Sequence, residues 1–185
     1  MQPDLQPGHL SSEWVTLHPL KPEDFEQLYA VASDPLIWEQ HPNKNRYRRE
    51  VFENFFKGAI ESGGAFLITD TKTGKPIGSS RFCNYNEAEG SIEIGYTFYA
   101  RSCWGKEYNR SAKALMIQYA FDFSDTVIFH IGAGNIRSQK AIEKIGARKT
   151  GEESHQYFGE APVLNFNYAI KKTDWETTSA GQLPQ

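Results

Sequence analysis

The segment 101–110, RSCWGKEYNR, combines a glycine with a group of cations where a helix is expected to begin. Gly105 permits a tight turn, and the N–H groups that follow it have no partner within the helix itself, so they suit a pyrophosphate. Lys106, Arg110 and Lys113 stand at the helix end where positive charge is least favourable, unless an anion offsets both the charge and the dipole. The alternative is an ordinary connection whose cations face solvent.

Two further segments carry polar residues that suit chemistry. Asn135 and Ser138 follow an apolar run, and either they only cap the next helix or they also hydrogen-bond a ligand lying between two helix starts. Glu93 shares one strand face with Ser91 and Gly95, because side chains alternate along a strand. A carboxylate in that place either faces solvent or lines a cleft as an acid or base.

Several other kinds of chemistry are excluded by motif. The sequence lacks the P-loop pattern, a complete G-x-G-x-x-G, the G-x-S-x-G elbow and H-E-x-x-H. Cys83 and Cys103 form no C-x-x-C pair, so we predict two free thiols and no metal site. His130 lies in an apolar strand, and we interpret it as a structural core histidine. The net charge of −3 gives no overall attraction to nucleic acid.

The elements that must position these residues follow one another in a mixed order. Alternation predicts strands, and three- and four-residue spacing predicts helices. We expect strands at 14–20, 65–69, 77–84, 91–98, 126–131, 149–158 and 163–170, and helices opening at Pro22 and covering 47–60, 107–123 and 135–145. This order is typical of an α+β fold, in which the crossover within 91–131 allows two strands to be parallel.

The length of 185 residues suits one domain. We expect a loose segment at 1–13, a single domain at 14–173 and a loose tail at 174–185, because both ends are polar and rich in Pro, Gly, Gln, Ser and Thr. No apolar run is long enough to span a membrane, and the amino terminus lacks a signal pattern, so we predict a cytoplasmic protein that binds no membrane.

The motifs above occur in an order that resembles the GNAT N-acetyltransferases. Glu93-Ile-Gly-Tyr is followed by Trp104-Gly-Lys-Glu-Tyr-Asn and then by Asn135-Ile-Arg-Ser-Gln-Lys-Ala-Ile-Glu-Lys-Ile-Gly-Ala. With the opening Leu17 to Asp24, the order looks most like the ribosomal-protein (RimJ/RimL-like) branch. The resemblance covers about 14–172. It implies a central mixed, mostly antiparallel seven-stranded sheet, splayed in a V and flanked by about four helices, with acetyl-CoA in the cleft.

The resemblance also implies site residues. Those for acetyl-CoA would be Phe98, Trp104, Gly105, Lys106, Glu107, Tyr108, Asn109, Arg110, Asn135 and Ser138. The sequence departs from the family pattern at Ser102 and Glu107, and the second change puts a carboxylate beside the expected pyrophosphate unless Arg110 pairs with it. Ile142 stands where many members carry a tyrosine that protonates the departing thiolate, so Ser138 is the substitute acid.

The predicted reaction is direct transfer of an acetyl group from CoA to a primary amine, either a protein N-terminus or a small amine. Glu93 is the expected base, with a pKa raised by partial burial. The alternatives are an inactive binding module of the same fold and a resistance enzyme for aminoglycoside-type drugs. We expect a monomer or homodimer that binds acetyl-CoA and an amine, with no metal and no direct nucleic-acid contact.

The acceptor itself is not defined by the sequence. The basic run 43–49 either meets an acidic partner or is solvated surface. Trp38, Tyr85 and Tyr157 either line an acceptor pocket or fill the core.

Overall fold

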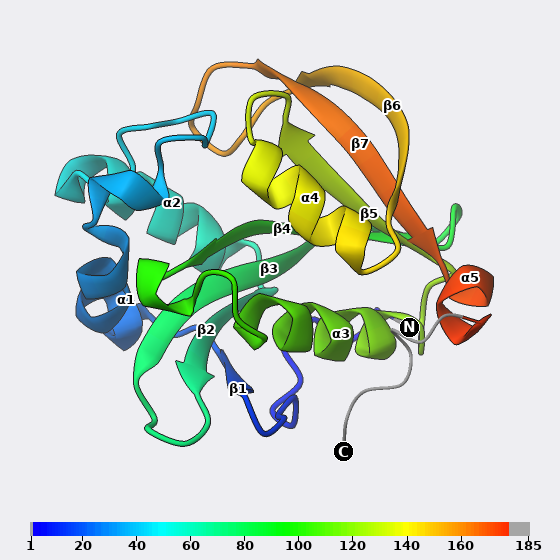
Figure 1. Ribbon diagram of the computed structural model, residues 1–185, viewed down its shortest axis with the longest axis horizontal. Coiled ribbons are helices and arrows are strands. Elements are labelled where there is room, and N and C mark those ends of the chain that lie inside the picture. Colours follow the sequence, from blue (N-terminus) through cyan, green and yellow to red (C-terminus); the bar gives the residue numbers. More distant parts are fainter. Residues whose placement is uncertain (1, 178–185) are drawn as a thin grey trace.

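The computed structural model describes residues 2–177, in which seven strands form one sheet ordered β1-β2-β3-β4-β5-β7-β6 (Figure 1). The strands are β1 Val15–Pro19, β2 Ala65–Asp70, β3 Pro76–Asn86, β4 Ser91–Tyr99, β5 Thr126–Gly132, β6 Arg148–His155 and β7 Val163–Lys171. The α-helices of this part of the chain are α1 Phe25–Ala32, α2 Arg49–Glu61, α3 Tyr108–Ala120, α4 Ile136–Lys144 and α5 Lys172–Thr177. Short 3-10 turns cover Pro22–Asp24, Pro35–Ile37 and Arg101–Cys103. The expected α+β class and seven-stranded, mostly antiparallel sheet are confirmed, with α5 as an added helix.

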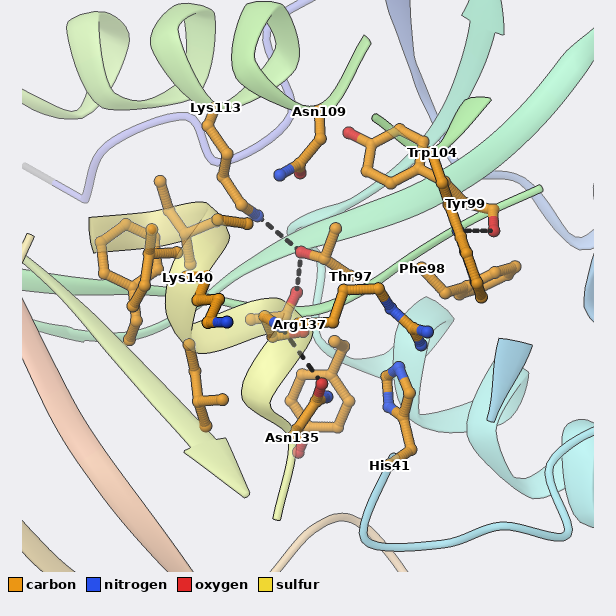
Figure 2. A pocket seen from close by; sticks show the side chains of 18 of the residues that line it. His41, Thr97, Phe98, Tyr99, Trp104, Asn109, Lys113, Asn135, Arg137 and Lys140 are labelled. Carbon is orange, nitrogen blue, oxygen red and sulfur yellow. Dashed lines mark hydrogen bonds between the residues drawn. The ribbon is translucent and has the colours of Figure 1, made fainter. Parts of the chain in front are cut away.

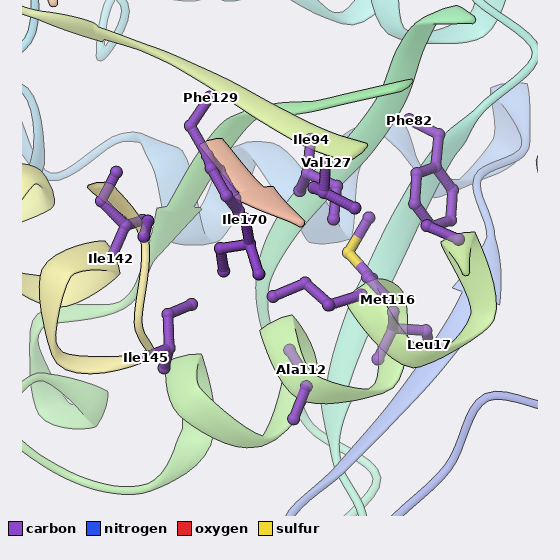
Figure 3. Close-up of a cluster of buried hydrophobic side chains, with 14 of the residues drawn as sticks. Leu17, Phe82, Ile94, Ala112, Met116, Val127, Phe129, Ile142, Ile145 and Ile170 are labelled. Atoms are coloured by element: carbon purple, nitrogen blue, oxygen red, sulfur yellow. The ribbon is translucent and has the colours of Figure 1, made fainter. Parts of the chain in front are cut away.

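Each face of the sheet has its own core. Along β2, Phe66 and Ile68 pack with α3 and α4, while Ala65 and Leu67 pack with α1 and α2. The whole strand is apolar for this reason, since both of its faces are covered. Figure 3 shows the first core, in which side chains of the sheet, α3 and α4 meet, including Ile94, Met116, Phe129, Ile142 and Ile145.

The sheet divides between its two central strands. β4 and β5 are parallel, as the crossover through α3 allows, and they pair only from Ser91 to Glu93 against Thr126 to Ile128. Beyond Glu93 both strands continue without pairing to each other. The register of β4 against β3 also shifts there, and Tyr96 has a φ of 54°. The bulge turns β4 away from β5 and opens the sheet.

Both ends of the domain pack more closely than their composition suggests. The Tyr119 hydroxyl donates a 2.7 Å hydrogen bond to the Asp4 carbonyl, and Leu10 is buried. Within the predicted tail, Trp175 is buried at 2% exposure on α5. A polar segment is held in place when even one large apolar side chain finds a core to enter. Residues 178–185 lie outside the described part of the chain.

Candidate active site

A cavity of about 640 Å³ occupies the opening of the sheet, bounded by β4, β5, the first turns of α3, the length of α4 and the segment before α2. Nine of the ten residues predicted to bind acetyl-CoA line it: Phe98, Trp104, Gly105, Lys106, Glu107, Asn109, Arg110, Asn135 and Ser138. Tyr108 does not line the cavity. Its hydroxyl donates a 2.6 Å hydrogen bond to Asp70, and its ring packs edge-on against Trp14. The first turn of α3 therefore turns Tyr108 toward β2 instead.

The start of α3 offers a row of free backbone N–H groups. Gly105 has a φ of 71°, which only glycine adopts without strain, and it bends the chain into the helix. Among the described residues, no acceptor takes a hydrogen bond from the N–H groups of Gly105 to Arg110. The Trp104 indole donates to the Tyr99 carbonyl at 3.1 Å and fixes the loop from the other side. Such a helix start favours an anion through both its donors and its dipole.

The Glu107 carboxylate pairs with the Arg110 guanidinium, the partner that the sequence suggested. Its carboxylate Oε2 lies 3.7 Å from Nη1 of Arg110, and both side chains are about half exposed. An exposed pair of this kind stabilises by at most about 1 kcal/mol. Arg110 thus compensates the negative charge of Glu107, while the carboxylate stays beside the free N–H groups.

The start of α4 is capped and also lines the cavity. The Asn135 side chain accepts a hydrogen bond from the Ser138 backbone N–H at 3.2 Å, so capping, one of the two alternatives for these residues, is present. No residue in the range 2–177 forms a hydrogen bond with the Ser138 hydroxyl, which leaves it available in the cavity.

Two cations enter the cavity in ways that the sequence did not indicate. Arg137 lies over the Trp104 ring at 3.8 Å and donates to the Ile37 carbonyl at 3.1 Å. Lys113 is not a solvated cation, because it is 4% exposed and its ammonium donates to Ser80 and Thr97. Figure 2 shows Lys113 directed at Thr97, with the Arg137 guanidinium beside Trp104.

Glu93 lies behind the cavity wall rather than on it. Its carboxylate is 2% exposed, accepts a 2.6 Å hydrogen bond from Asn84 and lies 3.0 Å from Nδ1 of His130. Burial raises the pKa of Glu93, but the His130 imidazole and the Asn84 amide outweigh burial, so the pKa is lower than usual. The expectation of a raised pKa is therefore wrong. The reason is the cationic partner, which the sequence could not place beside Glu93.

His130 joins Glu93 to the surface. It lines the cavity, and its Nε2 lies 3.0 Å from the Glu153 carboxylate, which is 49% exposed. Burial lowers the pKa of His130, but the two carboxylates outweigh burial and hold it above its usual value. His130 was interpreted as a core histidine, yet it is the one imidazole that bridges a buried acid and an exposed one among the described residues.

His155 stacks on this group. Its ring lies 4.6 Å from that of His130 at an interplanar angle of 17°. Ligand atoms of Glu93, His130 and His155 all lie within 4.8 Å of one another, a separation that a metal ion could bridge. Stacked rings, however, hold their nitrogen lone pairs in two parallel planes, whereas ligands of one ion must converge on it. The arrangement suits a π stack.

The far side of the cavity is closed by a buried ion pair. Arg46 donates to Glu160 through Nε and Nη2 at 2.9 and 2.8 Å, and its guanidinium lies over the rings of Trp38, Phe55 and Tyr157. This pair ties the loop between β6 and β7 to the segment before α2. The basic run 43–49 therefore contributes a structural cation that neither alternative anticipated.

The three aromatic residues whose role was left open divide between core and cavity. Trp38 is fully buried in the core under α1 and α2, and Tyr85 packs against Phe123. Tyr157 lines the cavity. No helix among residues 2–177 is long and apolar enough to cross a membrane.

Most of the sequence matches a known protein family. Residues 15–148 match the family described as the acetyltransferase (GNAT) domain. A sequence comparison with curated proteins found no match.

Solved structures share the fold at low sequence identity. A GCN5-related N-acetyltransferase from Brucella melitensis is similar with a TM-score of 0.79 and 22% identity, over 94% of this chain and 81% of that one. RimJ of Mycobacterium smegmatis, solved with CoA-disulfide, has a TM-score of 0.70 and 19% identity over 91% and 87%. Spermidine N-acetyltransferase from Vibrio cholerae, solved with CoA and spermine, has a TM-score of 0.68 and 16% identity over 90% and 100%.

Proposed function

Because this chain belongs to the GNAT acetyltransferase family and is an acyltransferase, we propose that it moves an acetyl group from acetyl-CoA directly to a primary amine. The observation that carries the proposal is the cavity itself. It runs from the free N–H groups at the start of α3 to the opening between β4 and β5, where His130 and Glu93 meet. One end suits a polyphosphate, and the other holds groups that can accept a proton.

Acetyl-CoA would lie along the α3 and α4 side of the cavity. Its pyrophosphate would accept hydrogen bonds from the N–H groups of Gly105 to Arg110, with Lys106 adding positive charge. Asn135 and Ser138 would face the pantetheine. Glu107 opposes this charge in part, and its pairing with Arg110 limits the opposition. The site fits acetyl-CoA because its unfilled groups are donors and cations, which need an anion.

The amine needs a base because it arrives protonated. An alkyl amine with a pKa near 10.4 is neutral in about one molecule in 2,500 at pH 7. Glu93, the predicted base, holds its own proton weakly since its pKa is lowered. We therefore assign the base role to Glu93 and His130 together, with the carboxylate holding the charge and the imidazole facing the cavity.

The residues of the cavity define the amine acceptor only as a broad class. Either a protein N-terminus or a small amine is compatible with a cavity that offers His130 and Tyr157 on the acceptor side, with Glu93 behind His130. The similarity to RimJ supports the ribosomal-protein branch, while the spermidine enzyme supports a small amine. A cytoplasmic location and the absence of nucleic acid and membrane partners remain part of this proposal.

The proposal is tested in two steps with purified full-length protein. CoA should raise the melting temperature, and thiol release from acetyl-CoA should follow when peptides with free N-termini or small amines are added. Replacing Glu93 with Gln should lower the rate by at least about tenfold. Glu89→Gln, in the exposed turn before β4, is the matched control and should retain the wild-type rate.

Four outcomes would contradict parts of the proposal. If CoA does not raise the melting temperature, the proposed acetyl transfer from acetyl-CoA is wrong. A shift without thiol release from any amine would indicate a binding module that has lost catalysis, and release only with aminoglycosides would indicate a resistance enzyme. An unchanged rate in Glu93→Gln would take Glu93 out of the base role.

A further inference from the structure

Lys113 is a buried cation that has no anionic partner in the described part of the chain. Its side chain is 4% exposed, and Nζ donates to the hydroxyls of Ser80 at 3.1 Å and Thr97 at 2.6 Å. No carboxylate among residues 2–177 forms an ion pair with it. An ammonium has three donors, so one remains unfilled. Burying a charge without a counter-charge destabilises a fold, and perturbed ionisable groups that line a cavity cluster at functional sites.

The position of Lys113 makes acetyl-CoA that ligand. The residue is four positions after Asn109 on α3, so the two side chains share the helix face that lines the cavity. Its ammonium reaches across to Thr97 on β4, four residues beyond Glu93 and next to the bulge that opens the sheet (Figure 2). Lys113 thus stands between the anion-binding start of α3 and the place where the acyl group would meet the amine.

No acid among the described residues of the cavity competes with a ligand for Lys113. The other ionisable side chains that α3, α4 and the preceding loop bring to the cavity are Lys106, Glu107, Arg110, Arg137, Lys140 and Lys144. Glu107 is the one acid among the residues that line the cavity, and it pairs with Arg110. On the described strands, Lys113 donates hydrogen bonds to the hydroxyls of Ser80 and Thr97, which themselves lie 2.8 Å apart.

The groups that the family pattern suggests are poor proton donors for a thiolate. The hydroxyl of Ser138, the substitute acid expected from the sequence, lines the cavity, but an alkyl hydroxyl holds its proton far more tightly than an ammonium does. Ile142, which occupies the position of the family tyrosine, is buried in the core. Tyr99 has a buried hydroxyl without a partner in the described chain, but burial raises its pKa and makes it a poor acid. Burial acts in the opposite sense on Lys113 and lowers its pKa to about 7. An ammonium that holds its proton weakly can give it to a thiolate, whose conjugate acid has a pKa near 8.5.

We propose that Lys113 is the catalytic acid that stabilises and protonates the departing CoA thiolate. When the tetrahedral intermediate collapses, the carbonyl re-forms, the carbon–sulfur bond breaks and its electron pair stays on sulfur. Sulfur then takes a proton from Nζ of Lys113, directly or through the Thr97 hydroxyl, and leaves as CoA thiol. Lys113, now neutral, regains a proton from solvent, while the proton lost by the amine leaves through Glu93 and His130. This role rests on the proposed acetyl transfer.

The test is the pH dependence of kcat. In the wild type kcat should fall as pH rises above about 7, because Lys113 then loses the proton that it gives to sulfur. Lys113→Met should lack this fall. Lys172→Met is the matched control, since Lys172 donates to the Phe121 carbonyl outside the cavity. It should keep the wild-type pH profile.

A kinetic measurement separates catalysis from binding. Lys113→Met should lower kcat by at least about tenfold and change KM for acetyl-CoA much less. Thr97→Val, which removes the hydroxyl but leaves the lysine, should lower kcat in the same direction and keeps the inference testable if Lys113→Met folds poorly.

The outcomes distinguish this inference from the function on which it rests. If CoA binds and acetyl transfer occurs but kcat depends on pH alike in wild type and Lys113→Met, the inference is wrong and the proposed function stands. If mass spectrometry finds acetylated Lys113 after incubation with acetyl-CoA, the lysine is an acceptor instead, which also overturns it. If CoA does not bind the wild type, both fail.

Discussion

Arg46 and Lys113 are both buried cations, 2% and 4% exposed, on opposite sides of one cavity. Arg46 meets a carboxylate through two hydrogen bonds and is surrounded by three aromatic rings. Lys113 meets two hydroxyls and no acid within the described residues. The charge of Arg46 is paired without a ligand, whereas the charge of Lys113 is not. Equal burial therefore does not mean an equal role, and the partners of a charge separate a structural cation from a functional one.

The chemistry of the two side chains agrees with this division. A guanidinium keeps its proton when buried and fits a carboxylate and flat rings, so Arg46 can hold the loop between β6 and β7 over the cavity. An ammonium loses its proton more readily when buried, so Lys113 can serve in proton transfer. Their difference should appear as opposite responses to mutation.

The largest expected effect is the loss of the Arg46 partner. Glu160→Ala should lower the free energy of unfolding by about 3 kcal/mol, because it leaves Arg46 buried and uncompensated. Urea denaturation at neutral pH measures this change. Glu53→Ala, which removes an exposed partner of Arg49, is the control and should cost less than about 0.5 kcal/mol. Equal effects in the two variants would show that the Arg46 pair is not structural.

Replacing Lys113 should have a smaller and opposite effect on the free energy of unfolding. Its pKa falls from the ordinary 10.5 to about 7 on folding, so between these values the unfolded chain binds more protons than the folded chain. The wild type should therefore gain stability as pH rises through this window, by up to about 1.4 kcal/mol per pH unit. Lys113→Met should lack this gain and should be the more stable protein at about pH 7.5.

Urea denaturation of both proteins at about pH 7.5 and about pH 9 checks this slope. Other groups titrate in the same range, so the decisive quantity is the difference between wild type and variant. If the difference in the free energy of unfolding between wild type and Lys113→Met does not change with pH, Lys113 keeps its ordinary pKa. The contrast drawn with Arg46 would then be wrong.

The smallest expected effect concerns the exposed pair beside the anion site. Glu107→Gln should tighten CoA binding by about two- to fivefold, since it removes a negative charge from the start of α3. Isothermal titration calorimetry at low salt measures the affinity, and the gain should shrink as salt is added because the groups are exposed. Weaker binding after Glu107→Gln would show that the carboxylate positions Arg110 for CoA.

The sequence predicted most of the elements and most of the residues that line the α3 and α4 side of the cavity because those features are local. Alternation and helical spacing lie within ten to twenty residues, and the loop from Trp104 to Arg110 carries its glycine, its free N–H groups and its charges in one segment. Tyr108 was the exception. Its side chain turned toward Asp70, and the phenol's partner lies 38 positions away in the sequence.

The acceptor side could not be predicted because its contacts join distant segments. Arg46 meets Glu160 across 114 positions, and Glu93 meets His130 only because β4 and β5 are parallel and begin to separate at that point. The pKa of Glu93 was expected to rise because burial follows from the sequence pattern, whereas the neighbouring cation does not.

What the sequence determined by itself was the order of elements, the glycine and free N–H groups at the start of α3 and the candidate carboxylate, since backbone preferences and amphipathic periods act over short distances. Only the tertiary structure decided which charges meet. It gave Arg46 a carboxylate, joined Glu93 to His130 and left Lys113 with two hydroxyls. The energy of a buried charge depends on its neighbours in space, and the divided sheet brings those neighbours from different strands.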